Sequence, residues 1–394
     1  MRIHLAVSVS LLACLVSCVP SGQARLRAAR AYSRTEWYSA IATGIVSGMT
    51  LAEKASQTLM TSIDGRESFP PHLHEHFRGT VPGAVILFGY NIAPSPAAVR
   101  SYIASCDAAF SRLGAPVPPF FAVDNEGGSV FRTSAVTKRL PSAASVRANL
   151  APEAAEDLYF AAGRSLSSLG ISMNLAPVAE PGLGEGKDFL GDRAYGATPD
   201  IASSYALAAM KGYRRAGVVP VAKHFPGSSV ADPHESATEL DVSLRELDSR
   251  YLASFAPLVA EGLQAILVSG VRVTAIDPDV PFCLSRRGVT GYLREGLGFS
   301  GLVITDDIAM RSISSGGDDA ARAAVLAIGA GCDLVMTSAP NLREIARAIV
   351  SEAERDPEFA RALDRAVTRI VATKISAGLV PTPLRSLYLD TVRR

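Results

Sequence analysis

The loop after residue 227 carries a carboxylate and an imidazole at a spacing suited to proton transfer. The segment reads KHFPGSSVADPHES over residues 223–236 and places Asp232, Pro233 and His234 in a row. Pro233 favours an extended backbone at Asp232, and residues two apart in an extended segment project to the same side. A carboxylate beside an imidazole orients the ring and favours its protonated form. The pattern predicts a general acid and base at His234 supported by Asp232; the alternative is a solvated loop with an incidental ion pair.

A second candidate group stands at the end of the apolar run GLVIT. Asp306 and Asp307 follow this run directly. A carboxylate at the end of a buried strand is held rigidly and can face a cavity, where it could attack an electrophilic carbon. The alternative is that either residue caps the following helix, which is a common role for aspartate.

These groups stand at the ends of short apolar runs, and the runs predict the strands that position them. Continuous β-branched and aromatic runs of this length fit strands that are buried on both faces, as in a parallel sheet. The runs cover residues 83–91, 118–128, 171–180, 218–227, 265–273, 301–310 and 332–338. Segments with helical period lie between them and cover residues 153–169, 199–215, 243–262 and 319–330.

The alternation of strand and helix predicts an α/β fold, either a (β/α)8 barrel of TIM type or a doubly wound open sheet. Several strand ends carry polar groups, and barrel enzymes assemble their sites from that rim. An open sheet would concentrate its site at one switch point, and no glycine-rich phosphate loop follows the first strand. We therefore expect a single catalytic barrel domain over residues 36–394.

Composition narrows the classes of ligand. Of the 394 residues, 48% are hydrophobic. The 39 Lys and Arg residues nearly equal the 38 Asp and Glu residues, so the net charge does not favour binding to a nucleic acid. Cys106, Cys283 and Cys332 have no metal-site spacing and are too few for a disulfide scaffold. The histidines of PPHLHEHF, residues 70–77, also lack the usual spacing, although they are the alternative metal site. We expect a small neutral ligand, with no metal and no cofactor.

The first residues predict export. MRIHLAVSVSLLACLVSC has a basic start and an apolar run too short to cross a bilayer comfortably, which is typical of a signal peptide. The ending Leu-Val-Ser-Cys fits a bacterial lipobox, and it predicts a signal over residues 1–17, lipidation of Cys18 and a tether over residues 18–35. The alternative is an ordinary signal cleaved near Ala24. We expect a monomer that meets a membrane only through this lipid anchor and faces the periplasm or the cell exterior.

Several motifs taken together resemble a known family. KHFPG followed closely by Asp-x-His occurs with VDNEGG, NLAPV, GDRAYG and GFSGLVITDDIAM, in that family's order. MTLAEKASQTLM at residues 49–60 is similar to its opening segment. The resemblance covers about residues 36 to 350 and is to glycoside hydrolase family 3, in the single-domain branch of bacterial β-N-acetylglucosaminidases, or β-hexosaminidases.

The resemblance implies a role for each matching residue. Asp306 would be the nucleophile that forms a covalent glycosyl-enzyme intermediate, and His234, paired with Asp232, would be the acid and base. The positions that would hold the sugar are Asp124, Arg132, Arg193, Lys223 and His224. Glu126 would support the loop, and Glu235 or Glu239 would be the acid if the dyad fails.

The chain departs from the family pattern at three places. Ser228 and Ser229 stand where the family usually reads His-Gly, and the loop to the Asp-x-His is two residues shorter. Ser129 stands where relatives commonly have Arg, and Gly270 where they often have His. These changes bear on the placement of the acid and base and on the fit of the substrate.

The function that the resemblance implies is hydrolysis of terminal β-linked GlcNAc, from peptidoglycan fragments or related glycans, by a retaining exo-acting enzyme. A β-glucosidase or β-xylosidase of the same family is an alternative, but those relatives commonly take their acid and base from another domain. A sugar-binding lipoprotein that has lost turnover is the alternative from a different class. The departures above suggest it, but the presence of Asp306, His234 and Arg193 argues against it.

Overall fold

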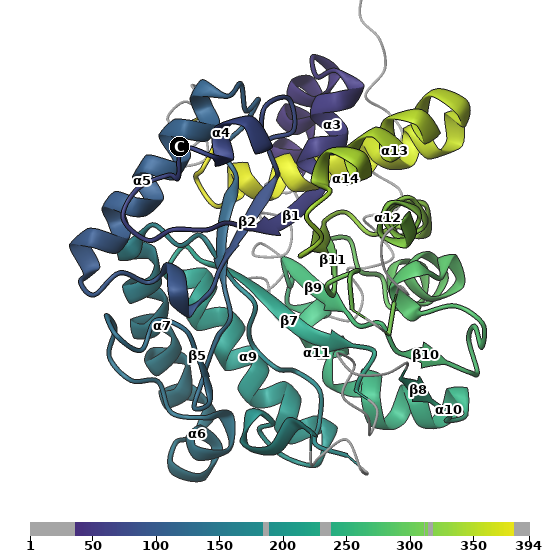
Figure 1. Ribbon diagram of the computed structural model, residues 1–394. Coiled ribbons are helices and arrows are strands. Elements are labelled where there is room, and N and C mark those ends of the chain that lie inside the picture. The colour runs from purple at the N-terminus through teal and green to yellow at the C-terminus, as the bar shows by residue number, and fades with distance from the viewer. Residues whose placement is uncertain (1–35, 184–188, 229–237, 311, 314–317, 382–394) are drawn as a thin grey trace, which may run out of the picture.

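The computed structural model describes residues 36–183, 189–228, 238–310, 312–313 and 318–381 (Figure 1). The expected signal peptide, Cys18, the tether and the dyad of Asp232 and His234 lie outside these ranges. At the centre of the described part, parallel strands form a sheet with helices packed around it (Figure 1).

Eight parallel strands form the central sheet and close on themselves. They are β1 (Leu59–Ser62), β2 (Ala84–Leu87), β3 (Phe120–Val123), β6 (Met173–Asn174), β7 (Val219–Phe225), β9 (Ala265–Val268), β11 (Leu302–Thr305) and β12 (Val335–Thr337). Their order is β11-β9-β7-β6-β3-β2-β1-β12. A parallel bridge between Ile304 of β11 and Leu334, just before β12, joins the two ends of this order. The closed sheet is a (β/α)8 barrel, which confirms the predicted fold class.

Helices surround the barrel and connect its strands (Figure 1). The longer ones are α5 (Pro96–Arg112), α7 (Pro152–Leu169), α9 (Pro199–Arg215), α12 (Asp318–Ala330), α13 (Leu342–Arg355) and α14 (Pro357–Ser376). The shorter ones are α3 (Leu51–Gln57), α4 (Leu73–His76), α6 (Ala143–Asn149), α10 (Leu244–Glu246), α11 (Ala256–Ala260) and the π-helix η7 (Arg287–Gly296). Two small sheets pair β4 (Asn125–Gly127) with β5 (Val130–Phe131) and β8 (Glu239–Leu240) with β10 (Arg272–Val273).

Two expectations about the elements need correction. The segment 243–262 is not one helix but a chain of short pieces: α10, the π-helix η4 (Leu247–Tyr251), the 3-10 helix η5 (Leu252–Ser254) and α11. Pro257 lies in the first turn of α11, where its missing N–H costs no hydrogen bond, but it could not lie inside a longer helix. The first barrel strand, β1, is absent from the predicted runs because its four residues end in Thr61 and Ser62 and follow α3 after one residue.

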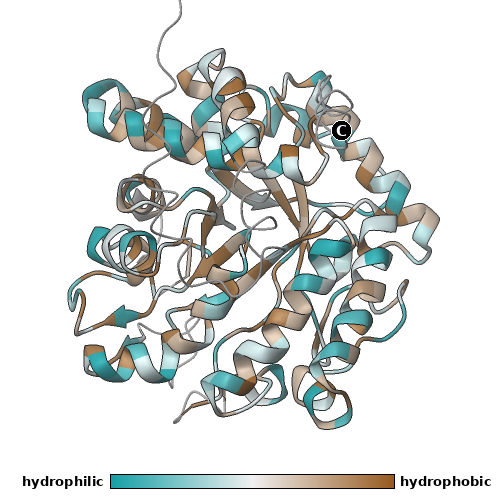
Figure 2. Ribbon diagram, turned by 180° about the vertical axis from the view of Figure 1, so that it is seen from behind, coloured by the Kyte–Doolittle hydropathy of each residue, from teal (hydrophilic) through white to brown (hydrophobic). Residues whose placement is uncertain are grey.

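Successive side chains of each strand point alternately into the barrel and out toward the helices. The apolar residues therefore form two cores, one inside the barrel and one between the barrel and the helices. Alternate strand residues such as Ile86, Ala122, Val221 and Ile304 pack together inside the barrel. Their chain neighbours face outward and pack against the helices. Viewed from behind, the molecule has hydrophobic strands at its centre and hydrophilic residues gathered on the helices (Figure 2). Because every second residue of a strand faces inward, a residue's position along its strand determines whether its side chain can reach the inside of the barrel.

The last helix closes the amino-terminal end of the barrel. Lys374 of α14 is fully buried, donates to Gln57 Oε1 at 2.7 Å and lies 5.4 Å from the ring centre of Phe120. Gln57 precedes β1 and Phe120 begins β3, so this contact marks the amino ends of the strands. Burial lowers the pKa of Lys374 to about 7. Among the helices of the described ranges, none combines the length and apolarity needed to span a membrane.

Candidate active site

Asp306 continues the inward-facing series of β11. Leu302 and Ile304 pack inside the barrel, and the N–H of Asp306 donates to Val268 O at 2.9 Å, so the extended pairing reaches residue 306. Alternation therefore turns this carboxylate toward the mouth of the barrel. Its Oδ1 accepts from the N–H of Asp307 at 3.0 Å.

Asp307 has a different environment. Its Oδ1 accepts from the N–H of Ala309 at 2.9 Å and from the N–H of Ser338, after β12, at 3.0 Å. Helix α12 begins only at Asp318, so neither aspartate caps it. Asp307 thus ties the loops after β11 and β12 together, and the two adjacent aspartates accept hydrogen bonds from different backbone groups.

Lys223 joins two carboxylates from the neighbouring rim. Its Nζ lies 2.5 Å from Asp124 Oδ1 and 2.7 Å from Glu126 Oε1, and only 4% of its side chain is exposed. Burial lowers the pKa of Lys223, but the charges of Asp124 and Glu126 raise it further, so the net direction is upward. The ammonium stays charged because two carboxylates compensate for its lost hydration.

Glu126 is the buried centre of this network. Arg193 donates to it through two nitrogens, from Nε to Oε2 at 2.8 Å and from Nη2 to Oε1 at 2.9 Å. Burial raises the pKa of Glu126, while Lys223 and Arg193 lower it, and the outcome is a pKa of about 2. The prediction that Glu126 supports the loop fits its contacts with Arg193 and Lys223.

The two glycines after Glu126 let this strand turn back closely. Gly127 and Gly128 have φ values of +103° and +59°. A Cβ on Gly127 would lie 2.2 Å from Pro141 O, and one on Gly128 would lie 2.5 Å from the Cβ of Ser142. The turn of the EGG motif therefore needs both a left-handed backbone and the absence of side chains.

A register shift in β7 brings two consecutive residues to the site. The pairing of β7 with β9 is irregular between Ala222 and Phe225, and such irregularities re-aim side chains. Lys223 reaches Asp124 as described, and His224 places Nδ1 2.6 Å from Glu180 Oε1. The same Glu180 oxygen accepts from Ser228 Oγ at 3.0 Å.

Arg132 is the least integrated of the predicted sugar-binding residues. It follows β5 and is half-buried, and its Nε is buried without a hydrogen-bond partner in the described part of the chain. Of the five, the contacts given above connect Asp124, Lys223 and Arg193 through Glu126, while His224 is held by Glu180. Within the residues that the structure describes, Arg132 makes no hydrogen bond or ion pair with either group.

Other sequence candidates have different surroundings. Asp232, His234 and Glu235 lie outside the described residues, so the predicted acid and base stays a prediction. Glu239 is exposed on β8, beside β10. At Gly270, a Cβ would lie 2.4 Å from Ile313 Cγ1 and 2.8 Å from Ser312 Oγ, so the loop after β11 occupies the space of a side chain.

The histidines of α4 serve separate contacts. Nε2 of His72 lies 3.3 Å from Asp64 Oδ2 on the surface, whereas His74 and His76 pack edge-on against Phe69 and Phe77. Within the described ranges, no three metal-ligating side chains come together.

Glu180 is the residue that the sequence analysis missed. It ends the run ISMNLAPVAE and is only 2% exposed, yet it contacts His224 directly. The available signal was its position: a carboxylate directly after an apolar strand-like run, as at Asp124 and Asp306.

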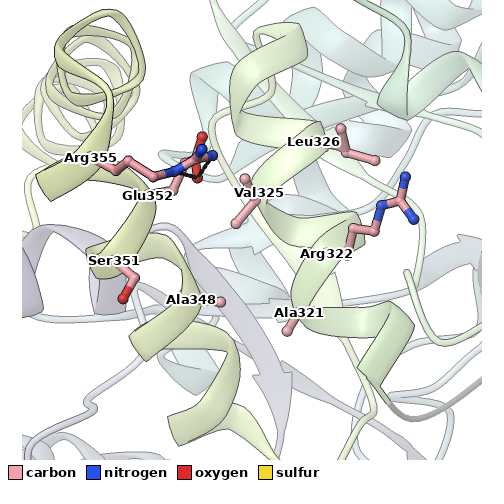
Figure 3. A pocket seen from close by; sticks show the side chains of 8 residues that line it. All are labelled: Ala321, Arg322, Val325, Leu326, Ala348, Ser351, Glu352 and Arg355. Carbon is pink, nitrogen blue, oxygen red and sulfur yellow. Dashed lines mark hydrogen bonds and ion pairs between the residues drawn. The ribbon is translucent and has the colours of Figure 1, made fainter.

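A separate hollow lies in the outer helix layer. It has a volume of about 620 Å³ between α12 and α13 and is open to solvent (Figure 3). Its lining is Ala321, Arg322, Val325, Leu326, Ala348, Ser351, Glu352 and Arg355. None of these side chains belongs to the rim network, so the hollow is distinct from the candidate active site.

The closed barrel and its charged carboxyl-end rim define a (β/α)8 barrel of the class that carries enzyme sites. A family model described as the glycosyl hydrolase family 3 N terminal domain matches residues 50–373. The chain belongs to glycosyl hydrolase family 3, which confirms the resemblance of its motifs.

Named relatives agree with this assignment. A protein named beta-hexosaminidase from Methylococcus capsulatus is 36% identical over 220 residues, which make up 55% of this chain and 65% of that relative. A family 3 β-N-acetylglucosaminidase structure from Paenibacillus sp. str. FPU-7 superimposes with a TM-score of 0.79 at 29% identity, over 86% of this chain and 65% of that one. A β-N-acetylhexosaminidase structure from Beutenbergia cavernae gives 0.74 at 28% identity, over 83% and 98%. The chain thus spans just under two thirds of the first two proteins and nearly all of the third.

Proposed function

We propose that the protein is a retaining exo-β-N-acetylglucosaminidase that releases terminal β-linked GlcNAc from a glycan. The names of its relatives support this activity. The observation that carries the proposal is the inward position of Asp306 at the end of β11, on the same rim as Asp124, Lys223 and His224.

Asp306 acts as the nucleophile in this mechanism. One of its carboxylate oxygens bonds to the anomeric carbon as the bond to the leaving oxygen breaks, and His234 in its protonated form gives that oxygen a proton. The neutral His234 then takes a proton from water, the water oxygen attacks the anomeric carbon, and Asp306 leaves as a carboxylate. Asp232 orients the imidazole in both steps.

The buried network holds the sugar that reacts. Asp124 accepts hydrogen bonds from sugar hydroxyls, and its hydrogen bond from Lys223 fixes the direction of the carboxylate. Arg193 is itself fixed by two hydrogen bonds to Glu126, and Nη1, which takes no part in them, is the nitrogen left to donate to the sugar. Groups that are oriented before the substrate binds lose little freedom on binding.

We propose peptidoglycan fragments as the natural substrate and an exported lipoprotein, anchored through Cys18, as the form that meets them. The sequence of the first eighteen residues supports this location. Metabolic labelling with a fatty-acid analogue is expected to mark the wild type and not Cys18→Ala; equal labelling of both would overturn the anchor.

One experiment addresses the reaction and its nucleophile together. A fluorinated GlcNAc donor that reacts quickly and hydrolyses slowly is expected to leave one sugar on the peptide that contains Asp306. A label on another carboxylate would refute the assignment. Stabilisation by GlcNAc without product would indicate a sugar-binding protein, and faster cleavage of the matching β-glucoside would indicate a β-glucosidase.

A further inference from the structure

Glu180 is a buried carboxylate directly behind a candidate sugar-binding residue. Its side chain is 2% exposed, and that of His224 is 15% exposed. Their contact, Nδ1 to Oε1, measures 2.6 Å, which is short for an N–H···O hydrogen bond and typical of one to a charged group. The ring of His224 is thus partly exposed, while the carboxylate that its Nδ1 contacts is enclosed.

This contact decides which ring nitrogen faces the substrate. A carboxylate in its ionised form only accepts hydrogen bonds, so in that form of Glu180 the proton of this contact belongs to Nδ1. In the neutral ring Nε2 is then the acceptor, and it lies on the side away from Glu180. A histidine whose second nitrogen is held by a carboxylate has a fixed tautomer and a fixed ring plane.

Ser228 adds a feature that belongs to this chain. It stands where family members usually read His, and its hydroxyl donates to the same Glu180 oxygen at 3.0 Å. The turn between them is tightly packed, because a Cβ on Gly227, where φ is +144°, would lie 2.6 Å from the Tyr251 ring. Glu180 thus accepts from both ends of the segment 224–228.

We propose that Glu180 is a positioning residue that fixes the tautomer and orientation of His224, with Ser228 as a second donor that holds the carboxylate in place. The role in catalysis rests on the proposed function, since His224 acts on the bound sugar. The expected order of importance is His224, then Glu180, then Ser228.

The test compares Glu180→Met, which keeps the volume but removes the acceptor, with Glu180→Asp, which keeps the carboxylate. On a chromogenic β-GlcNAc substrate, Glu180→Met should lower kcat/KM by about 10- to 100-fold, the range known for carboxylates behind metal-bound histidines. Glu180→Asp should recover most of the loss, and Ser228→Ala should cost about threefold. In a His224→Ala background, Glu180→Met should cause no further loss, because its effect passes through the ring.

Nitrogen NMR of the His224 ring gives a readout that does not depend on turnover. In spectra recorded at a pH where the ring is neutral, the wild type should carry the ring proton at Nδ1, and Glu180→Met should shift it to Nε2. An unchanged tautomer, or an additive loss in the His224→Ala background, would overturn the positioning role. If the wild type releases no GlcNAc but the tautomer shifts as expected, the proposed function fails and the positioning of the ring stands.

Discussion

Asp124 Oδ1 and Lys223 Nζ lie 2.5 Å apart although 99 residues separate them in the chain. They stand at the carboxyl ends of β3 and β7, and both belong to the inward-facing series of their strands. Glu126 lies 2.7 Å from the same ammonium on its other side. The barrel therefore brings residues that are remote in sequence into one buried network of charges. The charges in this network shift pKa values and so make the stability of the protein depend on pH.

The first prediction concerns acid stability. The pKa of Glu126 is about 2 in the folded protein, below the ordinary value of 4.5, because Lys223 and Arg193 outweigh the effect of burial. This contribution is fully present above pH 4.5 and is lost as the pH falls toward 2. Its size is about 3 kcal/mol at roughly 1.36 kcal/mol per pKa unit.

Urea unfolding between pH 6 and pH 3 checks this expectation. Glu126→Gln should be less stable than the wild type at pH 6 and should show a flatter decline toward pH 3. Glu246→Gln, which removes an exposed partner of Arg250, should decline as the wild type does. Parallel curves for wild type and Glu126→Gln would contradict the assignment.

The second prediction separates the adjacent aspartates. Asp306→Ala should reduce turnover by about 10³-fold or more, because Asp306 acts on the substrate. Asp307→Ala should instead lower the unfolding free energy by about 1–3 kcal/mol, because the N–H groups of Ala309 and Ser338 lose their acceptor. Initial rates and urea unfolding of both variants provide the comparison. Equal losses of activity with equal stabilities would show that the two residues share one role.

The fold was accessible from the sequence because buried parallel strands leave long apolar runs. Helix α9 begins and ends as the period predicts, at Pro199 and Arg215. The strand β1 was missed because it is short and polar at its end, and the helix over 243–262 failed because Pro257 interrupts it. Local sequence patterns reflect the burial of side chains and the hydrogen bonding of the backbone. A secondary-structure prediction based on them fails where a single residue alters the burial or the hydrogen bonding of its element.

The site was only partly accessible. Asp124, Lys223 and Asp306 could be predicted as candidate site residues on two grounds. Each lies at or near the end of an apolar strand-like run, and each belongs to a motif that resembles the family. The function of Glu180 depends on a contact with His224 that crosses 44 residues, and no local pattern contains it. Glu180 and His224 come together because of the order of the strands around the barrel, which is a property of the whole fold.

The third prediction concerns Gly270, where relatives often carry histidine. A Cβ there would approach Ile313 Cγ1 to 2.4 Å, so Gly270→Ala should destabilise the protein by about 1–3 kcal/mol through overpacking. Gly270→Ala combined with Ile313→Ala should cost less than the sum of the two single changes, because the second removes the obstacle. Thermal unfolding of the three variants measures the coupling. Additive losses would mean that the two residues do not compete for space.

The fourth prediction concerns Lys374 at the closed end of the barrel. Burial lowers its pKa from 10.5 to about 7, so between these values the unfolded chain binds a proton that the folded protein does not. The unfolding free energy should therefore rise with pH from about 7 to about 10.5, by up to a few kcal/mol from this group. Below pH 7 the folded state carries the full cost of a buried charge.

Lys374→Met tests this directly, since methionine fills similar space without a charge. It should raise the midpoint of thermal unfolding at pH 6 and flatten the increase between pH 7 and pH 9. Lys211→Met is the matched control, because Lys211 is one-third exposed and lies 3.7 Å from Glu261 on the surface. A control and a Lys374→Met protein with the same pH profile would show that the ammonium of Lys374 keeps its proton in the folded barrel, held by Gln57 and the ring of Phe120.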